Sequence, residues 1–120
     1  MPLQFPKRDE ATTKFFEKVV PAGPTVKIRP MFGHRAAFVN GNLFASTFGT
    51  QVVVRLDTAA RESVLKEEGA SIFEPVKGRK MREYVVLPDS WKKDSDRVRR
   101  LMTDSLRWAS KLPPKAGRKP

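Results

Sequence analysis

The stretch that decides the fold is residues 35–56, which read RAAFVNGNLFASTFGTQVVVRL. Arg35–Val39 and Leu43–Phe48 flank Asn40-Gly41-Asn42, and Asn-Gly is the strongest short-range signal for a β-hairpin. Both residue types tolerate the positive φ angles that tight hairpin turns require. Gln51–Leu56 follows closely, and its three consecutive valines suit a pleated surface. The centre of the chain is therefore predicted to be an antiparallel meander.

Amphipathic helices are predicted before, within and after the strands. The first covers Asp9–Val20, with a capping aspartate at its start and a proline directly after it. A second helix of about ten residues opens at Asp57-Thr58. The last covers about Ser95–Leu112, with a broad apolar stripe and arginines on the other side. Strands at Ser71–Glu74 and Arg82–Leu87 lie between the second and third helices, separated by a basic turn at residues 77–80. The predicted fold class is α+β, an antiparallel sheet with N-terminal, middle and C-terminal helices packed against it.

Length and composition indicate one domain. The 120 residues are 39% apolar and 31% charged, which is typical of a globular chain large enough for one core. We expect residues 9–112 to form the domain, residues 1–8 to be flexible and residues 113–120 to be a disordered basic tail. The absence of cysteine excludes disulfides and thiolate chemistry. No apolar run approaches the length of a membrane span and the N-terminus does not resemble a secretory signal, so a cytoplasmic location without membrane partners is expected.

Positive charge is concentrated in the last third of the chain. Residues 1–76 hold 10 Lys/Arg and 8 Asp/Glu, a net of +2, whereas residues 77–120 hold 14 and 5, a net of +9. This asymmetry suggests a polyanionic partner, although a solvated charged surface explains it equally well. The candidate nucleic-acid contacts are Lys77, Arg79, Lys80 and Arg82 in the basic turn, and Arg99, Arg100, Arg107 and Lys111 on the last helix, continued by Lys115, Arg118 and Lys119.

No motif in the sequence predicts catalysis, a cofactor or a metal. His34 is the only histidine, follows a glycine in an expected loop and has no carboxylate or further ligand nearby in sequence, so we expect a structural or incidental role for it. Gly33 and Gly41 do not form a phosphate-binding loop and are interpreted as turn residues. The strand aromatics could stack nucleobases, but core packing is the preferred interpretation. These residues are Phe38, Phe44, Phe48, Phe73 and Tyr84.

The order of several short motifs resembles the N-terminal domain of the TfoX/Sxy family. Met31-Phe32-Gly33 matches the entry of that family's pattern, and Phe38–Ala45 matches its hairpin with a glycine turn and an apolar return strand. The resemblance covers about residues 9–115. The family-motif residues, interpreted as mainly structural, are Met31, Phe32, Gly33, Gly41, Phe44, Tyr84 and Pro88.

Two features depart from the family pattern. His34 stands where the family commonly has a second glycine, and we expect a single-domain member that lacks the C-terminal domain of full-length competence regulators. The resemblance implies a non-enzymatic regulatory or interaction module with a protein partner, linked to transcriptional regulation. Two alternatives stay open: sequence-nonspecific nucleic-acid binding through the basic last third, and an enzyme with a pocket near His34. Homodimerisation through an exposed sheet edge is a further expectation.

Overall fold

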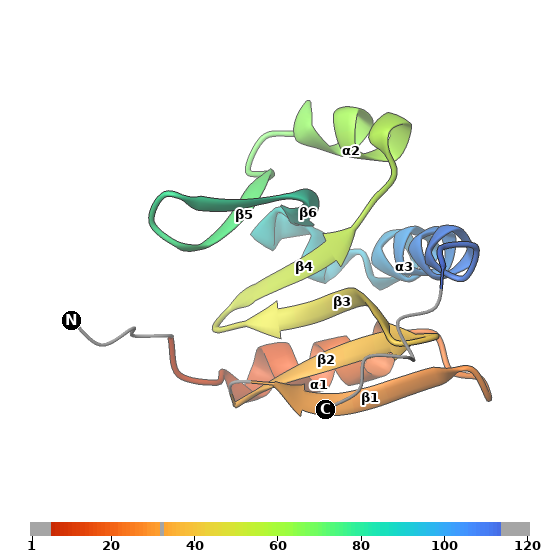
Figure 1. The fold of residues 1–120 in the computed structure, drawn as a ribbon. Coiled ribbons are helices and arrows are strands. Elements are labelled where there is room, and N and C mark those ends of the chain that lie inside the picture. The colour runs from red at the N-terminus through yellow and green to blue at the C-terminus, as the bar shows by residue number, and fades with distance from the viewer. Residues whose placement is uncertain (1–5, 32, 114–120) are drawn as a thin grey trace.

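A computed structural model describes residues 6–31 and 33–113 of the chain, so the expectations for residues 1–5 and 114–120, and for Phe32, fall outside the described residues. The described part contains three α-helices, one 3₁₀-helix and six strands (Figure 1). The helices are α1 (Glu10–Val19), α2 (Thr58–Leu65), η1 (Asp89–Lys93) and α3 (Ser95–Ala109). The strands are β1 (Val26–Met31), β2 (His34–Val39), β3 (Asn42–Phe48), β4 (Gln51–Arg55), β5 (Ser71–Val76) and β6 (Arg79–Val86).

The six strands form one antiparallel sheet in the order β1-β2-β3-β4-β6-β5. The first four strands follow one another as a meander, of which β2, β3 and β4 were predicted from the sequence. After α2 the chain returns so that β6 pairs with β4 and β5 takes the outer edge. The predicted α+β class, with helices at the N-terminal, middle and C-terminal positions, is confirmed.

The central hairpin has the two-residue turn that its sequence indicates. Asn40 and Gly41 have φ angles of 53° and 79°, and Val39 pairs with Asn42. Positive φ at both turn positions is the type I′ geometry, which matches the twist of the flanking strands. A β-bulge follows in β3, because Ala37 pairs with Ala45 while Phe38 pairs with Leu43.

The bulge in β3 shapes the core. Phe44 is the extra residue between the two pairs, and in a bulge the alternation of side chains is interrupted. Phe44 and Ala45 therefore both join the main hydrophobic cluster, and Phe44 is 0% exposed. The sequence predicted a core position for Phe44 but gave no sign of the bulge that provides it.

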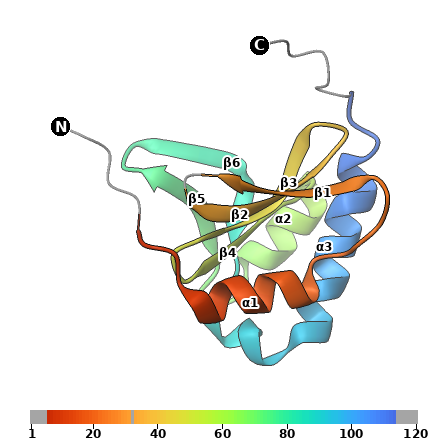
Figure 2. The same ribbon diagram turned by 90° about the horizontal axis from the view of Figure 1, so that it is seen from below.

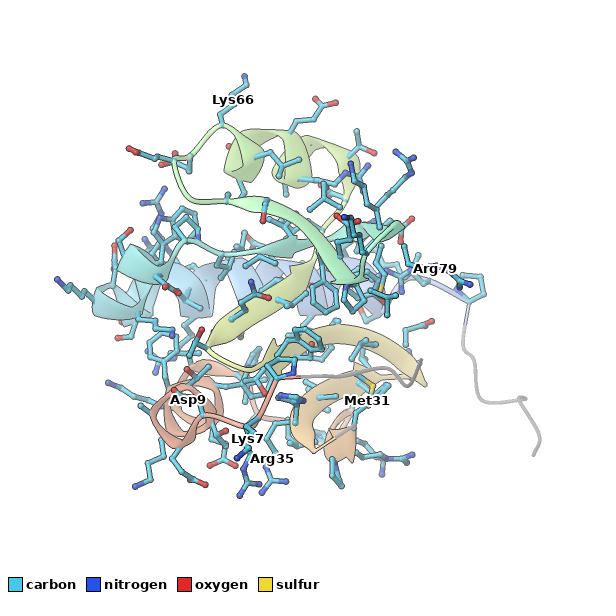
Figure 3. The ribbon with its side chains drawn as sticks, turned by 90° about the vertical axis from the view of Figure 1, so that its left-hand side faces the viewer. Lys7, Asp9, Met31, Arg35, Lys66 and Arg79 are labelled. Carbon is cyan, nitrogen blue, oxygen red and sulfur yellow. The ribbon has the colours of Figure 1, made fainter. Side chains whose placement is uncertain are left out.

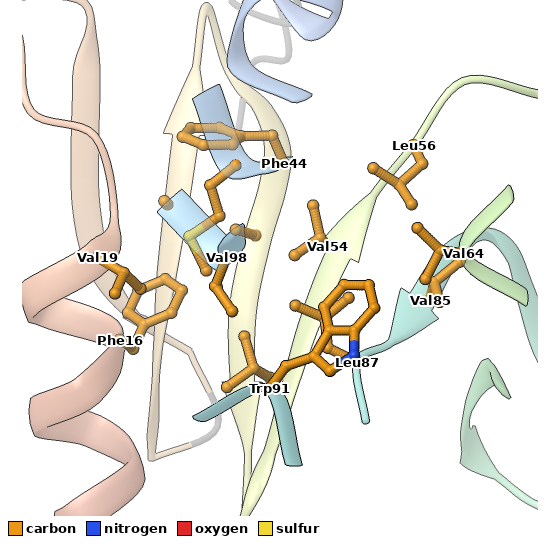
Figure 4. Packing of buried hydrophobic residues seen from close by; sticks show 14 of the residues in the cluster. Phe16, Val19, Phe44, Val54, Leu56, Val64, Val85, Leu87, Trp91 and Val98 are labelled. Atoms are coloured by element: carbon orange, nitrogen blue, oxygen red, sulfur yellow. The ribbon is translucent and has the colours of Figure 1, made fainter. Parts of the chain in front are cut away.

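All three α-helices pack on one face of the sheet. Figure 2 shows α1 and α3 lying across the same side, and Figure 4 shows Phe16 of α1, Val64 of α2 and Val98 of α3 pointing into one cluster with sheet residues such as Val54. Trp91 of η1, an element that the sequence did not predict, also belongs to this cluster. A second, smaller cluster lies on the opposite face and is formed by Val53, Phe73 and Val86.

The first two helices begin at the predicted capping residues, and all three α-helices have an aspartate cap. The side chains of Asp9, Asp57 and Asp94 each accept a hydrogen bond from a backbone N–H in the first turn of a helix. The last helix ends at Ala109, earlier than the predicted Leu112. After the helix, the N–H groups of Lys111 and Leu112 bond to carbonyls three positions back, which forms a tighter turn before Pro113.

Strand β1 had no predicted element and forms the free edge beside β2. It pairs with β2 along its whole length, from Val26 with Val39 to Met31 with His34. Pro30 is compatible with this position because the edge of a sheet does not require its missing N–H. Ile28 of this strand is 42% exposed.

Candidate functional site

The structure has two candidate binding sites: the basic hairpin of β5 and β6, and a cavity on the sheet face opposite the α-helices. The hairpin turns at Lys77-Gly78, a shorter turn than the predicted residues 77–80, and Gly78 has a φ of 87°. The Glu74 carboxylate accepts a hydrogen bond of 2.6 Å from the backbone N–H of Gly78. This bond and the positive φ fix the turn, which only glycine adopts without strain.

The hairpin presents its predicted cations to solvent. Lys77, Arg79, Lys80 and Arg82 are all exposed. None of them makes an ion pair with another residue of the described part of the chain. The hairpin's other acid, Glu83, pairs with Arg55 at 2.7 Å. Four cations within six residues are therefore available to an external anion.

Two of the cations predicted on the last helix make ion pairs, unlike the cations of the hairpin. Arg99 pairs with Asp96 at 3.3 Å and donates a second hydrogen bond to the Lys18 carbonyl. Arg107 pairs with Asp104 at 3.3 Å. Arg100 and Lys111 are exposed, while Lys115, Arg118 and Lys119 lie outside the described residues. The two predicted sets are thus on separate elements, and helix α3 interleaves its positive charge with carboxylates.

The cavity lies between the curled β5–β6 hairpin and the neighbouring face of β2 and β3. It measures about 190 Å³. In Figure 3 the labelled Met31, at the end of β1, lies below the hairpin that carries Arg79. Its apolar walls are formed mainly by Met31, Leu43, Phe48, Phe73, Val76 and Met81, and its polar groups by His34, Ser46, Thr47 and Tyr84. A second hollow beside Trp91 measures only about 10 Å³.

His34 is the most unusual residue of the cavity. It begins strand β2 and is 2% exposed, so the expected loop position was wrong. Its ring lies 5.4 Å from the Phe48 ring, and Phe48 in turn contacts Phe73 edge to face at 5.1 Å. Neither ring nitrogen of His34 has a hydrogen-bond partner among residues 6–31 and 33–113. Buried polar atoms are normally paired, so this histidine needs a physical explanation.

Tyr84 closes the cavity on the β6 side. Its hydroxyl donates a hydrogen bond of 3.3 Å to the Leu43 carbonyl across the sheet. Burial raises the pKa of the Tyr84 phenol above its ordinary value, and the nearby Arg55 guanidinium opposes that shift. Arg55 also lies 5.6 Å from the Tyr84 ring centre, a cation–π contact. The phenol is therefore a neutral hydrogen-bond donor at ordinary pH.

The strand aromatics fall into two groups that the sequence did not separate. Phe44 is buried under the helices, as predicted. Phe48, Phe73 and Tyr84 pack on the opposite face and line the cavity. Phe38 is half-buried on β2. Whether an aromatic faces the core or the cavity depends on the bulge and on the curl of the hairpin, and periodicity alone does not reveal either.

The described family-motif residues lie at several different places in the fold. Met31 lines the cavity, while Gly33 and Gly41 have φ angles of 82° and 79°. Pro88 follows β6 and its carbonyl accepts the first hydrogen bond of η1 from Trp91. Within the described ranges no group of three or more His, Asp or Glu side chains could hold a metal ion. No described helix has both the length and the apolar character needed to cross a membrane.

Comparison with known proteins agrees with this architecture. A family model described as the TfoX N-terminal domain matches residues 17–109, which include every described strand and the whole cavity. No curated protein matches the chain. Since the match spans most of the 120 residues, the chain belongs to the TfoX N-terminal domain family.

Proposed function

We propose that the chain is a non-enzymatic, cytoplasmic regulatory module that binds nucleic acid through the β5–β6 hairpin. Family membership supports a TfoX-like module, and a link to transcription accords with a nucleic-acid partner. The observation that carries the proposal is the set of four exposed hairpin cations without an ion pair to any described residue. Lysine and arginine placed in this way bind phosphate oxygens without reading base sequence.

The shape of the hairpin favours this surface over helix α3. The turn is fixed by Gly78 and by the Glu74 carboxylate, so its cations are held on a rigid two-stranded ribbon. On α3, a phosphate would have to compete with Asp96 for Arg99 and with Asp104 for Arg107. Because such competition lowers the binding free energy gained from each phosphate contact, we expect α3 to contribute less to nucleic-acid binding than the hairpin does.

The test is the salt dependence of binding to a fluorescent 20-base-pair duplex. Four phosphate contacts predict that log K falls with log salt with a slope of about −3.6, so affinity drops about 100-fold between 50 and 200 mM salt. The variant K77Q/R79Q/K80Q removes three hairpin charges. The matched control R100Q/R107Q/K111Q removes three charges from α3.

The two variants separate a hairpin site from a general charge effect. We expect the hairpin variant to reduce the magnitude of the salt slope by about 2.7, and the α3 variant by less than 1. Equal effects of the two variants would show that total charge, and not the hairpin, governs binding. Failure of the unaltered protein to bind duplex or single-stranded probes at 50 mM salt would remove nucleic acid as the partner and leave the protein-partner hypothesis.

A further inference from the structure

The cavity opposite the helices combines an apolar wall with a buried histidine, His34, whose ring nitrogens have no hydrogen-bond partner among the described residues. Its volume of about 190 Å³ contrasts with the close packing of the helix-covered face. Leaving a polar group buried and unpaired costs about 1–3 kcal/mol in general. A ligand that enters the cavity can supply the missing hydrogen bond.

The surroundings of His34 favour an anionic ligand group. No Asp or Glu is among the described residues that line the cavity. Cations are close to the lining residues in the strands: Arg79 lies opposite Val76 in the β5–β6 register, and Arg29 lies two residues before Met31 on β1, so that their side chains share one side of that strand. An N–H of an imidazole donates strongly to a carboxylate, and such charge-assisted bonds are about twice as strong as neutral ones.

The size and lining of the cavity limit the rest of the ligand. A protein cavity of about 150 Å³ accepts benzene, so about 190 Å³ accommodates a six-membered ring with one small substituent. Phe48 and Phe73 offer aromatic surfaces, and the side chains of Met31 and Met81 adapt readily to a ligand's shape.

We propose that this cavity binds a small aromatic carboxylic acid, with its carboxylate accepting a hydrogen bond from His34. The ring of the ligand packs against Phe48 and Phe73, and the carboxylate points towards the strand β2 side of the cavity. This inference rests on the cavity and His34, and it is independent of nucleic-acid binding by the hairpin. His34 then serves to recognise the ligand's carboxylate and not to catalyse a reaction.

The methionines provide a direct test with an internal control. We propose to label the methionine methyl groups with ¹³C and titrate the protein with sodium benzoate. Met31 and Met81 line the cavity, whereas Met102 is 0% exposed in the core on the other face. Saturable shifts of Met31 and Met81, without a shift of Met102, are expected. No saturable shift at Met31 and Met81, or equal shifts at all three, would overturn the proposal.

Recognition of the carboxylate is tested by comparing ligands and by replacing His34. Benzamide has nearly the same shape as benzoate but no charge, and we expect it to bind at least tenfold more weakly. His34→Phe should weaken benzoate about 10- to 100-fold while toluene, which needs no hydrogen bond, still shifts Met31 and Met81. Unchanged benzoate affinity in this variant excludes His34 as the recognition group. The comparison of benzoate with benzamide decides the ligand class even if the variant does not fold.

Discussion

Replacing His34 with phenylalanine should stabilise the protein, although the residue is almost completely buried. Its side chain is 2% exposed, and both ring nitrogens lack a hydrogen-bond partner among the described residues. A phenyl ring of nearly the same size keeps the contact with Phe48, now 5.4 Å between ring centres. The substitution therefore removes the unpaired polar atoms while it retains the aromatic packing.

The magnitude follows from the cost of burying a polar group without a hydrogen bond, about 1–3 kcal/mol. Water that enters the adjacent cavity relieves part of this cost, so we expect the free energy of unfolding to rise by about 1–2 kcal/mol. For a domain of this size, an increase of that order raises the thermal midpoint by about 5 °C.

Urea unfolding followed by circular dichroism measures this change. Phe44→Ala is the matched control, because Phe44 is also fully buried but lies under the helices, and its loss should cost about 3–5 kcal/mol. If His34→Phe lowers the free energy of unfolding by more than 1 kcal/mol, then His34 stabilises the free protein. The interpretation of His34 as a residue kept for binding is then wrong.

Three further predictions concern the fold. Hydrogen bonds from the side chain and backbone of Thr12 lower the pKa of the Asp9 carboxyl. The ionised carboxylate therefore stabilises the fold above the ordinary carboxyl pKa, and this stabilisation is lost as the pH falls through the lowered pKa. Asp9→Asn should flatten the decline of the thermal midpoint below about pH 4. Ser105→Ala should cost about 1–3 kcal/mol in urea unfolding, since its buried hydroxyl donates to backbone carbonyls of β3 and β4, and a cost near zero contradicts this role. Gly49→Ala should lower the thermal midpoint, because Gly49 has a φ of 64° and an added Cβ meets Pro6 at 2.9 Å; an unchanged midpoint argues against this packing.

The parts of the fold that depend on local chemistry could be predicted from the sequence. Asn40-Gly41 specifies a turn through its own backbone preferences, and Asp9, Asp57 and Asp94 specify helix starts through their side-chain oxygens. The position of β6 between β4 and β5 depends on pairing between segments far apart in the chain. No local pattern encodes that choice.

The cavity depends on the same long-range arrangement. A loop was predicted for His34 because a glycine precedes it, whereas pairing with Met31 places it at the start of strand β2. Its neighbours Phe73 and Met81 come from the hairpin about forty residues later in the chain. The candidate cations were all identifiable from the sequence, and the ion pairs of Arg99 and Arg107 have the i,i+3 spacing of neighbours on a helix. The hydrogen bond from Arg99 to the Lys18 carbonyl was not predictable, because it joins two helices that are far apart in the chain.

A crystal structure determined with saturating benzoate tests most directly whether the helix-free face holds a binding cavity built around His34, which has no hydrogen-bond partner among the described residues. We expect one benzoate between Phe48 and Phe73, with a carboxylate oxygen about 2.7–3.2 Å from a ring nitrogen of His34. A structure in which side chains fill the cavity, or in which a protein group already occupies the hydrogen-bonding positions of His34, would contradict it.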